Sequence, residues 1–257
     1  MESKKINKIN VSVFKPDTEE DQRPVRGNQL FSLLNANIYI CAKKLSGKST
    51  LIYNIIKRCT DDHTQIFICC TTINNDPIYK HIEKTYPNSK LTIDINDLLK
   101  FTSELSEEKK NEDLPAQPEK LCIKLKECNL NDEKKPKIIR KYKSPDYLFV
   151  LDDMGKQCQK FSEFLKIQRH FSSKCILSSQ YINDLALMQL QNLDYCILFG
   201  GHPQEKLEHI YRNIDLSLPF DLFLKIYKDA TTSKFNFLYI DIRNERFRKN
   251  FNTEYII

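Results

Sequence analysis

Residues 38–50 read IYICAKKLSGKST, and this stretch decides the fold. The apolar run IYIC predicts a strand. The segment that follows matches the phosphate-binding pattern G-x-x-x-x-G-K-[ST], except that Ala42 replaces the first glycine. The next apolar residues have the spacing of one helix stripe: Leu51, Ile52, Ile55, Ile56 and Cys59. A strand, this loop and an amphipathic helix, in that order, predict a nucleotide-binding loop.

Each residue type in this loop has a physical reason to be there. Loop N–H groups and the N-terminus of the following helix carry partial positive charge for phosphate oxygens. Gly47 lets the backbone close around the phosphates, Lys48 supplies a point charge, and Ser49 offers a hydroxyl to Mg²⁺. If position 42 requires a positive φ, alanine there costs about 1 kcal/mol. We therefore assign ATP binding to Ala42, Lys43, Lys44, Leu45, Ser46, Gly47, Lys48, Ser49 and Thr50.

Two carboxylates follow a second buried strand. Residues 147–151 are apolar, and Asp152 and Asp153 come directly after them. Carboxylates at the end of a buried strand are costly unless they have a partner, and a magnesium ion is the expected one. We expect Asp152, with Ser49, to hold the metal and Asp153 to orient and polarise the attacking water. The alternative is an ordinary turn with an aspartate as helix N-cap.

Two further polar residues are candidates for the catalytic set. Gln180 follows a strand predicted at 174–179, where P-loop ATPases with an extra strand place a polar residue toward the γ-phosphate. Arg169 lies two turns beyond Phe161 on the helix expected after the acidic strand, and it is a candidate arginine finger for a neighbouring subunit. An ordinary strand-end polar residue and a structural salt bridge are the respective alternatives, and Arg212 is a weaker finger candidate.

Five short continuous apolar runs indicate the fold class. They are residues 38–41, 66–70, 147–151, 175–177 and 195–199. Continuous rather than alternating runs are typical of strands covered on both faces, and the segments between them have helical spacing, so we predict an α/β sandwich. A weaker strand is expected at 90–93 and another at 234–243, followed by a basic tail.

Composition excludes several classes of protein. The 257 residues are 40% hydrophobic, which excludes a wholly disordered chain, and the net charge of +6 permits nucleic-acid contact without requiring it. No apolar run approaches the roughly 18–20 residues that span a bilayer, and we find no zinc-type cysteine spacing. Only five residues are glycine, and four of them follow predicted strands: Gly47, Gly155, Gly200 and Gly201.

We expect two departures from a single continuous domain. Residues 1–34 are predicted as an N-terminal extension and 35–257 as the ATPase domain. The segment 102–143 is rich in both charges and is predicted as a solvated insertion, with a mobile arm for a partner as the alternative.

With these motifs in order, the sequence resembles the FtsK–HerA-type genome-packaging ATPases of poxviruses, other large DNA viruses and virophages. The resemblance rests on LFVLDDMG at 148–155, EFLKIQRH at 163–170 and CILSSQ at 175–180, together with the phosphate loop. It implies a P-loop NTPase of RecA-like (ASCE) type, a three-layer sandwich with a central, mainly parallel sheet. It also implies that the strand before Gln180 lies between the two other motif strands.

The resemblance further implies an activity and its partners. They are a homo-oligomeric ring, Mg²⁺-dependent ATP hydrolysis, translocation of double-stranded DNA into a capsid, capsid or portal-like partners, and a place in the host-cell cytoplasm (viral factory) and the virion. Two alternatives stay open, a P-loop nucleoside or nucleotide kinase and a non-hydrolysing nucleotide-binding structural module.

Overall fold

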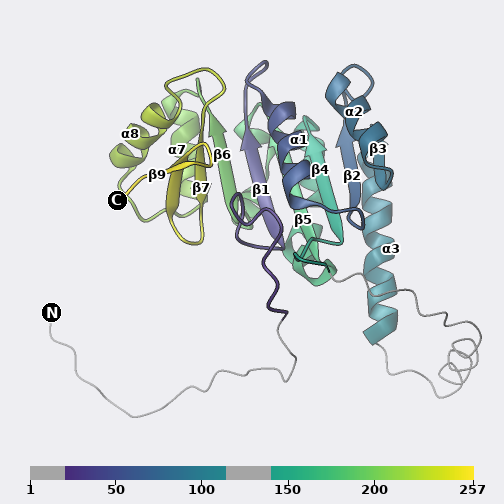
Figure 1. Ribbon diagram of the computed structural model, residues 1–257. Coiled ribbons are helices and arrows are strands. Elements are labelled where there is room, and N and C mark those ends of the chain that lie inside the picture. Colours follow the sequence, from purple (N-terminus) through teal and green to yellow (C-terminus); the bar gives the residue numbers. More distant parts are fainter. Residues whose placement is uncertain (1–20, 114–139) are drawn as a thin grey trace, which may run out of the picture.

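The computed structural model describes residues 21–113 and 140–257 (Figure 1). Nine strands in these residues form one sheet in the order β3-β2-β4-β5-β1-β6-β7-β8-β9. Neighbours from β3 to β6 pair in parallel, and β6, β7, β8 and β9 pair antiparallel. The strands are β1 (Ala36–Cys41), β2 (Gln65–Cys70), β3 (Ser89–Thr92), β4 (Tyr147–Asp152), β5 (Ser173–Ser179), β6 (Tyr195–Phe199), β7 (Phe237–Asp241), β8 (Arg246–Lys249) and β9 (Thr253–Glu254).

Helices cover both faces of the sheet. Figure 1 shows α1 (Lys48–Cys59) and α2 (Pro77–Thr85) in front of it, and their apolar residues share one core with Ile38 and Ile40. The other core contains Tyr39 and Cys41 with residues of α3 (Ile95–Asp113), α5 (Ser162–Ile167), α7 (Gln204–Asn213) and α8 (Phe220–Ala230). The short elements are η1 (Gly155–Phe161), η2 (Gln168–Phe171), η3 (Ile182–Asp184) and α6 (Leu187–Leu190).

The central strands are buried on both faces, as continuous apolar runs predict. Every residue of β1, β5, β6 and β7 is buried, and successive side chains of β1 alternate between the two cores. The α/β sandwich with a mainly parallel sheet is therefore confirmed. β5 lies between β4 and β1, so the strand before Gln180 has the position that the resemblance implied.

Two expected elements differ in extent. The strand predicted at 234–243 is shorter, because Phe235 has a left-handed backbone (φ 71°) and lies before β7. The single helix expected from Phe161 to Arg169 is broken into η1, α5 and η2, and the chain turns into β5 at Ser172, which is also left-handed (φ 47°). Arg169 consequently lies in a separate short turn.

The basic tail is folded rather than free. Arg246 and Arg248 of β8 pair with Glu254 at 3.9 and 2.9 Å, and Lys249 Nζ lies 3.8 Å from the Asp229 carboxylate. Two carboxylates therefore face three of the basic side chains of this tail.

Residues of the N-terminal extension and of the charged segment pack on the rest of the chain. Leu30 and Phe31 of the N-terminal extension are buried, and Val25 forms a bridge with Lys143. The first part of the charged segment belongs to α3, while residues 1–20 and 114–139 lie outside the described residues. None of the helices in 21–113 and 140–257 combines the length and the apolar composition that crossing a membrane requires.

Candidate functional site

The phosphate loop connects β1 to α1 at the carboxyl edge of the sheet. Gly47 (φ 93°) and Leu45 (φ 61°) have left-handed backbones. Ala42 does not: it is fully buried, and its N–H donates to Ser179 O at 3.1 Å. Since this position continues the sheet instead of turning, it does not require glycine, and the expected cost of alanine does not arise.

The backbone N–H groups of the loop are available as hydrogen-bond donors. Among the described residues, none accepts a hydrogen bond from a backbone N–H of residues 43–47. These N–H groups stand directly before the N-terminus of α1, where the helix contributes partial positive charge. The arrangement suits an anion with several oxygens, such as the phosphates of a nucleotide.

Lys48 lies between the loop and the acidic pair. Its Nζ is 3.0 Å from Asp152 Oδ1 and 2.5 Å from Asp153 Oδ2. Burial lowers the pKa of Lys48, but the attraction of the two carboxylates outweighs burial and leaves the pKa above its usual value. The residue therefore stays charged at neutral pH, as phosphate binding requires.

Asp152 ends β4 and is 2% exposed, and hydrogen bonds fix both of its oxygens. The Tyr79 hydroxyl donates to Oδ2 at 2.5 Å, and the Ser178 hydroxyl donates to Oδ1 at 2.7 Å. Burial next to Asp152 raises the pKa of Tyr79 well above its usual value, so this phenol remains a donor. Tyr79 lies on α2, in no motif, and sequence reasoning missed it; Ser178 belongs to the polar strand end that the sequence does display.

Asp153 is held in a strained conformation toward the same cavity. Its φ of 51° is left-handed, and its N–H donates to Ser178 O at 2.9 Å. Gln180 Nε2 donates to Asp153 Oδ2 at 3.1 Å. A non-glycine residue in this region costs on the order of 1–3 kcal/mol, and such strain is concentrated at functional sites.

Loop residues 43–45 and 47–50 line one cavity of about 570 Å³ together with Asp152, Asp153 and Gln180, whereas Ala42 and Ser46 do not line it. The structure thus brings together the phosphate loop, both carboxylates and Gln180, which the sequence assigned to one site. The remaining lining residues are Thr72, Asp76 and Ile78.

The cavity has a donor set that fits magnesium. A serine hydroxyl and two carboxylates are hard oxygen ligands, and Mg²⁺ usually takes only one or two carboxylates beside phosphate oxygens and water. In the described part of the chain, no group of three or more His, Cys, Asp or Glu side chains forms a self-sufficient metal cage. Ser49 and Asp152 are therefore the residues that would hold Mg²⁺, beside a bound nucleotide.

Arg169 and Arg212 do not join this site. Arg169 is exposed, and its carbonyl accepts from Asn35 Nδ2 at 3.2 Å, next to the amino ends of β1 and β5. Arg212 is exposed on α7 and pairs with Glu208 of the same helix at 2.5 Å. Neither lines the cavity that contains the phosphate loop and the acidic pair.

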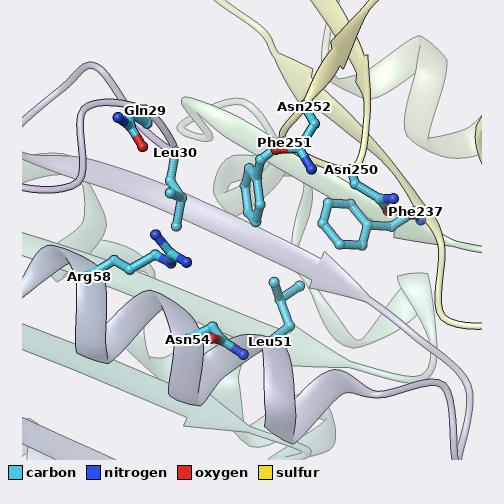
Figure 2. A pocket seen from close by; sticks show the side chains of 9 residues that line it. All are labelled: Gln29, Leu30, Leu51, Asn54, Arg58, Phe237, Asn250, Phe251 and Asn252. Atoms are coloured by element: carbon cyan, nitrogen blue, oxygen red, sulfur yellow. Dashed lines mark hydrogen bonds between the residues drawn. The ribbon is translucent and has the colours of Figure 1, made fainter.

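A second cavity lies beside α1 (Figure 2). It has a volume of about 310 Å³, and its walls come from α1, the segment 29–30 and the C-terminal hairpin, which comprises β7, β8 and residues 250–252. Leu51 and Asn54 of α1 and Phe237 of β7 line it, together with Arg58 and Phe251. It contains none of the residues that the sequence assigned to catalysis.

Comparison with known proteins places the fold. No protein-family model matches the chain, and no curated protein does. Among solved structures, it is similar to the genome-packaging NTPase B204 of Sulfolobus turreted icosahedral virus 2, in complex with ATP-gammaS (TM-score 0.52, 17% identity, 84% of this chain and 96% of that one) and with sulfate (TM-score 0.53, 16%, 84% and 96%). It is also similar to the pCW3 conjugation coupling protein TcpA with ATPgS (TM-score 0.52, 12% identity, 81% and 58%). The chain therefore has the P-loop ATPase fold of a viral genome-packaging NTPase and of a conjugation coupling protein.

Proposed function

We propose that this protein is a Mg²⁺-dependent ATPase that moves viral double-stranded DNA into a capsid. The observation that carries the ATPase part is the meeting of Lys48 with both Asp152 and Asp153, while Gln180 contacts Asp153. One cavity then contains the phosphate loop, a carboxylate to hold the metal, a carboxylate to orient water and a polar sensor. Phosphoryl transfer to water needs these groups together.

The residues have distinct roles in this proposal. The N–H groups of residues 43–47 bind phosphate oxygens, and Lys48 neutralises charge that develops on them. A magnesium ion held by Ser49 and Asp152 supplies further positive charge to those oxygens. Asp153 orients the attacking water and accepts its proton, and Gln180 fixes the Asp153 carboxylate by the 3.1 Å hydrogen bond.

DNA packaging is supported by the ordered motifs and by the fold shared with B204. In this role several copies form a ring, double-stranded DNA is bound without sequence preference, and a capsid or portal-like protein receives it. The corresponding location is the host-cell cytoplasm, in the viral factory, and then the virion. Contacts to DNA phosphates predict affinity that falls steeply with salt.

The test is ATP turnover with and without double-stranded DNA, measured across a size-exclusion profile. We expect stimulation by DNA and a loss of at least about 100-fold in Lys48→Ala and Asp153→Asn. Lys84→Ala and Asp221→Asn, exposed residues away from the cavity, are matched controls that keep turnover. Unchanged turnover in Lys48→Ala would falsify the proposal.

Two other outcomes identify the rival functions. Phosphoryl transfer to a nucleoside or nucleotide, without an effect of DNA, shows a kinase. Tight ATP binding without hydrolysis, with or without DNA, shows a nucleotide-binding structural module.

A further inference from the structure

A third cavity, of about 360 Å³, adjoins the phosphate loop, and neither Asp152 nor Asp153 lines it. It shares Gly47 and Thr50 with the catalytic cavity, so the same loop borders both cavities. Its other lining residues are mainly apolar: Ser46, Leu51, Asn54, Phe199, Phe235 and Phe237. No residue of this cavity beyond the loop itself has a role in the proposed hydrolysis.

Phe235 is the unusual member of this lining. It is 57% exposed, although phenylalanine is ordinarily buried, and its left-handed φ of 71° is rare for a bulky residue. Its ring lies over the loop, because a Cβ added to Gly47 would be 3.3 Å from Phe235 Cδ1. Core packing does not account for an exposed aromatic ring held in this way.

The segment around Phe235 is fixed by hydrogen bonds. Asn236 N–H donates to Ser233 O at 3.1 Å, and Asn250 Nδ2 donates to Asn236 Oδ1 at 3.1 Å. Phe237 N–H donates to Asn250 Oδ1, also at 3.1 Å, which ties the segment to the hairpin. The ring of Phe235 is therefore presented by an ordered turn.

The cavity also has one polar group with spare capacity. Asn54 Nδ2 donates to Thr50 O at 2.9 Å, so the amide is oriented, and no described residue donates to its Oδ1. Asn54 and Leu51 line both this cavity and the one in Figure 2, so the two cavities adjoin along α1.

We propose that this cavity binds the base of the nucleotide, with Phe235 as the face on which the base stacks. The inference rests on the proposed function, because the loop must hold the phosphates of the same molecule. A flat ring with an apolar face suits the aromatic wall, and Asn54 Oδ1 can accept from an exocyclic amino group such as that of adenine. The volume lies within the roughly 300–1,000 Å³ of small-molecule sites.

The test compares a nucleotide with a ligand that has no base. The affinities of ATP and of inorganic tripolyphosphate are measured by calorimetry, with Mg²⁺, for the wild type and three variants. Phe235→Ala and Phe235→Asn remove the ring, and asparagine tolerates the left-handed backbone; Phe235→Tyr keeps the ring. We expect the first two to bind ATP about 10-fold more weakly, with tripolyphosphate unchanged, and Phe235→Tyr to bind ATP as the wild type does.

Two results would overturn the base site. One is unchanged ATP affinity in Phe235→Ala and Phe235→Asn, and the other is an equal loss for ATP and tripolyphosphate. Failure of the proposed function gives a different result. If the protein binds ATP in a Phe235-dependent way but does not hydrolyse it, the base site is supported and the proposed ATPase is contradicted. If hydrolysis depends on Lys48 but ATP affinity does not depend on Phe235, the ATPase is supported and the base site is contradicted.

Discussion

Individual side chains around Asp152 fix the position of its carboxylate. Three groups from three elements contact one buried carboxylate: Lys48 of α1, Tyr79 of α2 and Ser178 of β5. A buried charge is tolerated only when it is paired and hydrogen-bonded, so each partner offsets part of the cost of burying Asp152. Tyr79 thereby joins α2 to the site, although it belongs to no motif of the sequence.

Replacing the Tyr79 hydroxyl should measure that contribution. Tyr79→Phe keeps the ring in the core and removes a hydrogen bond to a charged group, so we expect the free energy of unfolding to fall by about 1–2 kcal/mol. Urea denaturation at pH 7 is the measurement. Tyr53→Phe, whose hydroxyl makes only a 3.3 Å contact with exposed His81, is the control and should change stability by less than about 0.5 kcal/mol. Equal effects of the two substitutions would contradict this role.

Lys174 is a second buried charge, and it predicts a dependence of stability on pH. It is fully buried in β5, its Nζ donates to Leu33 O at 2.7 Å, and burial lowers its pKa to about 8. The unfolded chain then binds one more proton than the folded chain between about pH 8 and the ordinary value of 10.5. Stability therefore rises with pH in that window, and below pH 8 the whole cost of burying the charge is present.

Lys174→Met removes this titration while leaving all other groups. We expect the free energy of unfolding of the wild type, relative to Lys174→Met, to increase between pH 7.5 and pH 9.5 by on the order of 1–2 kcal/mol. Urea denaturation of both proteins at the two pH values tests this, and common effects of cysteine and tyrosine ionisation cancel in the comparison. A constant difference would show that Lys174 does not titrate in this range.

At the scale of elements, the N-terminal segment is fixed to the end of α1. Gly27 has a φ of 74°, and a Cβ there would lie 2.6 Å from Cys59 Sγ and 3.0 Å from Arg58 O. Lys174 holds the same segment through Leu33, and the buried Phe31 packs near it, with Nζ 5.5 Å from the ring centroid. Gly27, Phe31 and Leu33 thus connect this segment to α1 and β5.

Gly27→Ala should disturb this packing. The substitution adds a left-handed alanine, a clash with Cys59 Sγ and a tight contact with Arg58 O, so we expect a loss of about 2–4 kcal/mol in stability. Gly155→Ala is the matched control, because Gly155 also has a positive φ (54°) but nothing lies within 4 Å of its added Cβ. It should cost only about 1 kcal/mol. Thermal melting and urea denaturation distinguish the two, and similar losses would mean that the clash with α1 is relieved.

Across the whole molecule, the sheet separates Arg169 from the phosphate loop. Arg169 lies at the amino ends of β1 and β5 and the loop at their carboxyl ends, and seven-residue β5 spans roughly 20 Å. An arginine finger at this position can therefore act only on a nucleotide held by another copy of the chain. This placement agrees with the trans role expected from the sequence but leaves it a prediction.

Mixing two inactive variants tests the trans role. Arg169→Ala and Lys48→Ala are each expected to lose ATPase activity, by about 1,000-fold for the arginine. When they are mixed, intact loops of one variant meet intact arginines of the other, and we expect turnover above the sum of the separate values. Arg212→Ala tests the alternative finger candidate and should retain activity. Absence of any recovery in the mixture would argue against a finger in trans.

Residues that act through contiguous motifs could be predicted from the sequence. The loop at 42–50 and the pair Asp152 and Asp153 each follow directly after an apolar run, and Gln180 follows the run 175–177 after two serines. Parallel strands bring their carboxyl ends to one edge, so three short patterns and a predicted strand order were sufficient to place them in one site. The α/β sandwich followed from the same runs, because strands covered on both faces have no polar alternation.

Only the tertiary structure decided the rest, since it depends on contacts between distant segments. Tyr79 meets Asp152 across 73 positions, and Phe235 reaches Gly47 from the far end of the chain. The break that leaves Arg169 in a short turn, and the pairing of Arg246 and Arg248 with Glu254, also became visible only in the folded chain. The sequence by itself determined which residue types stand at the carboxyl edge of the sheet. Packing across the sheet determined the hydrogen-bond partners of Asp152 and the cavity beside the loop, because both depend on distant segments.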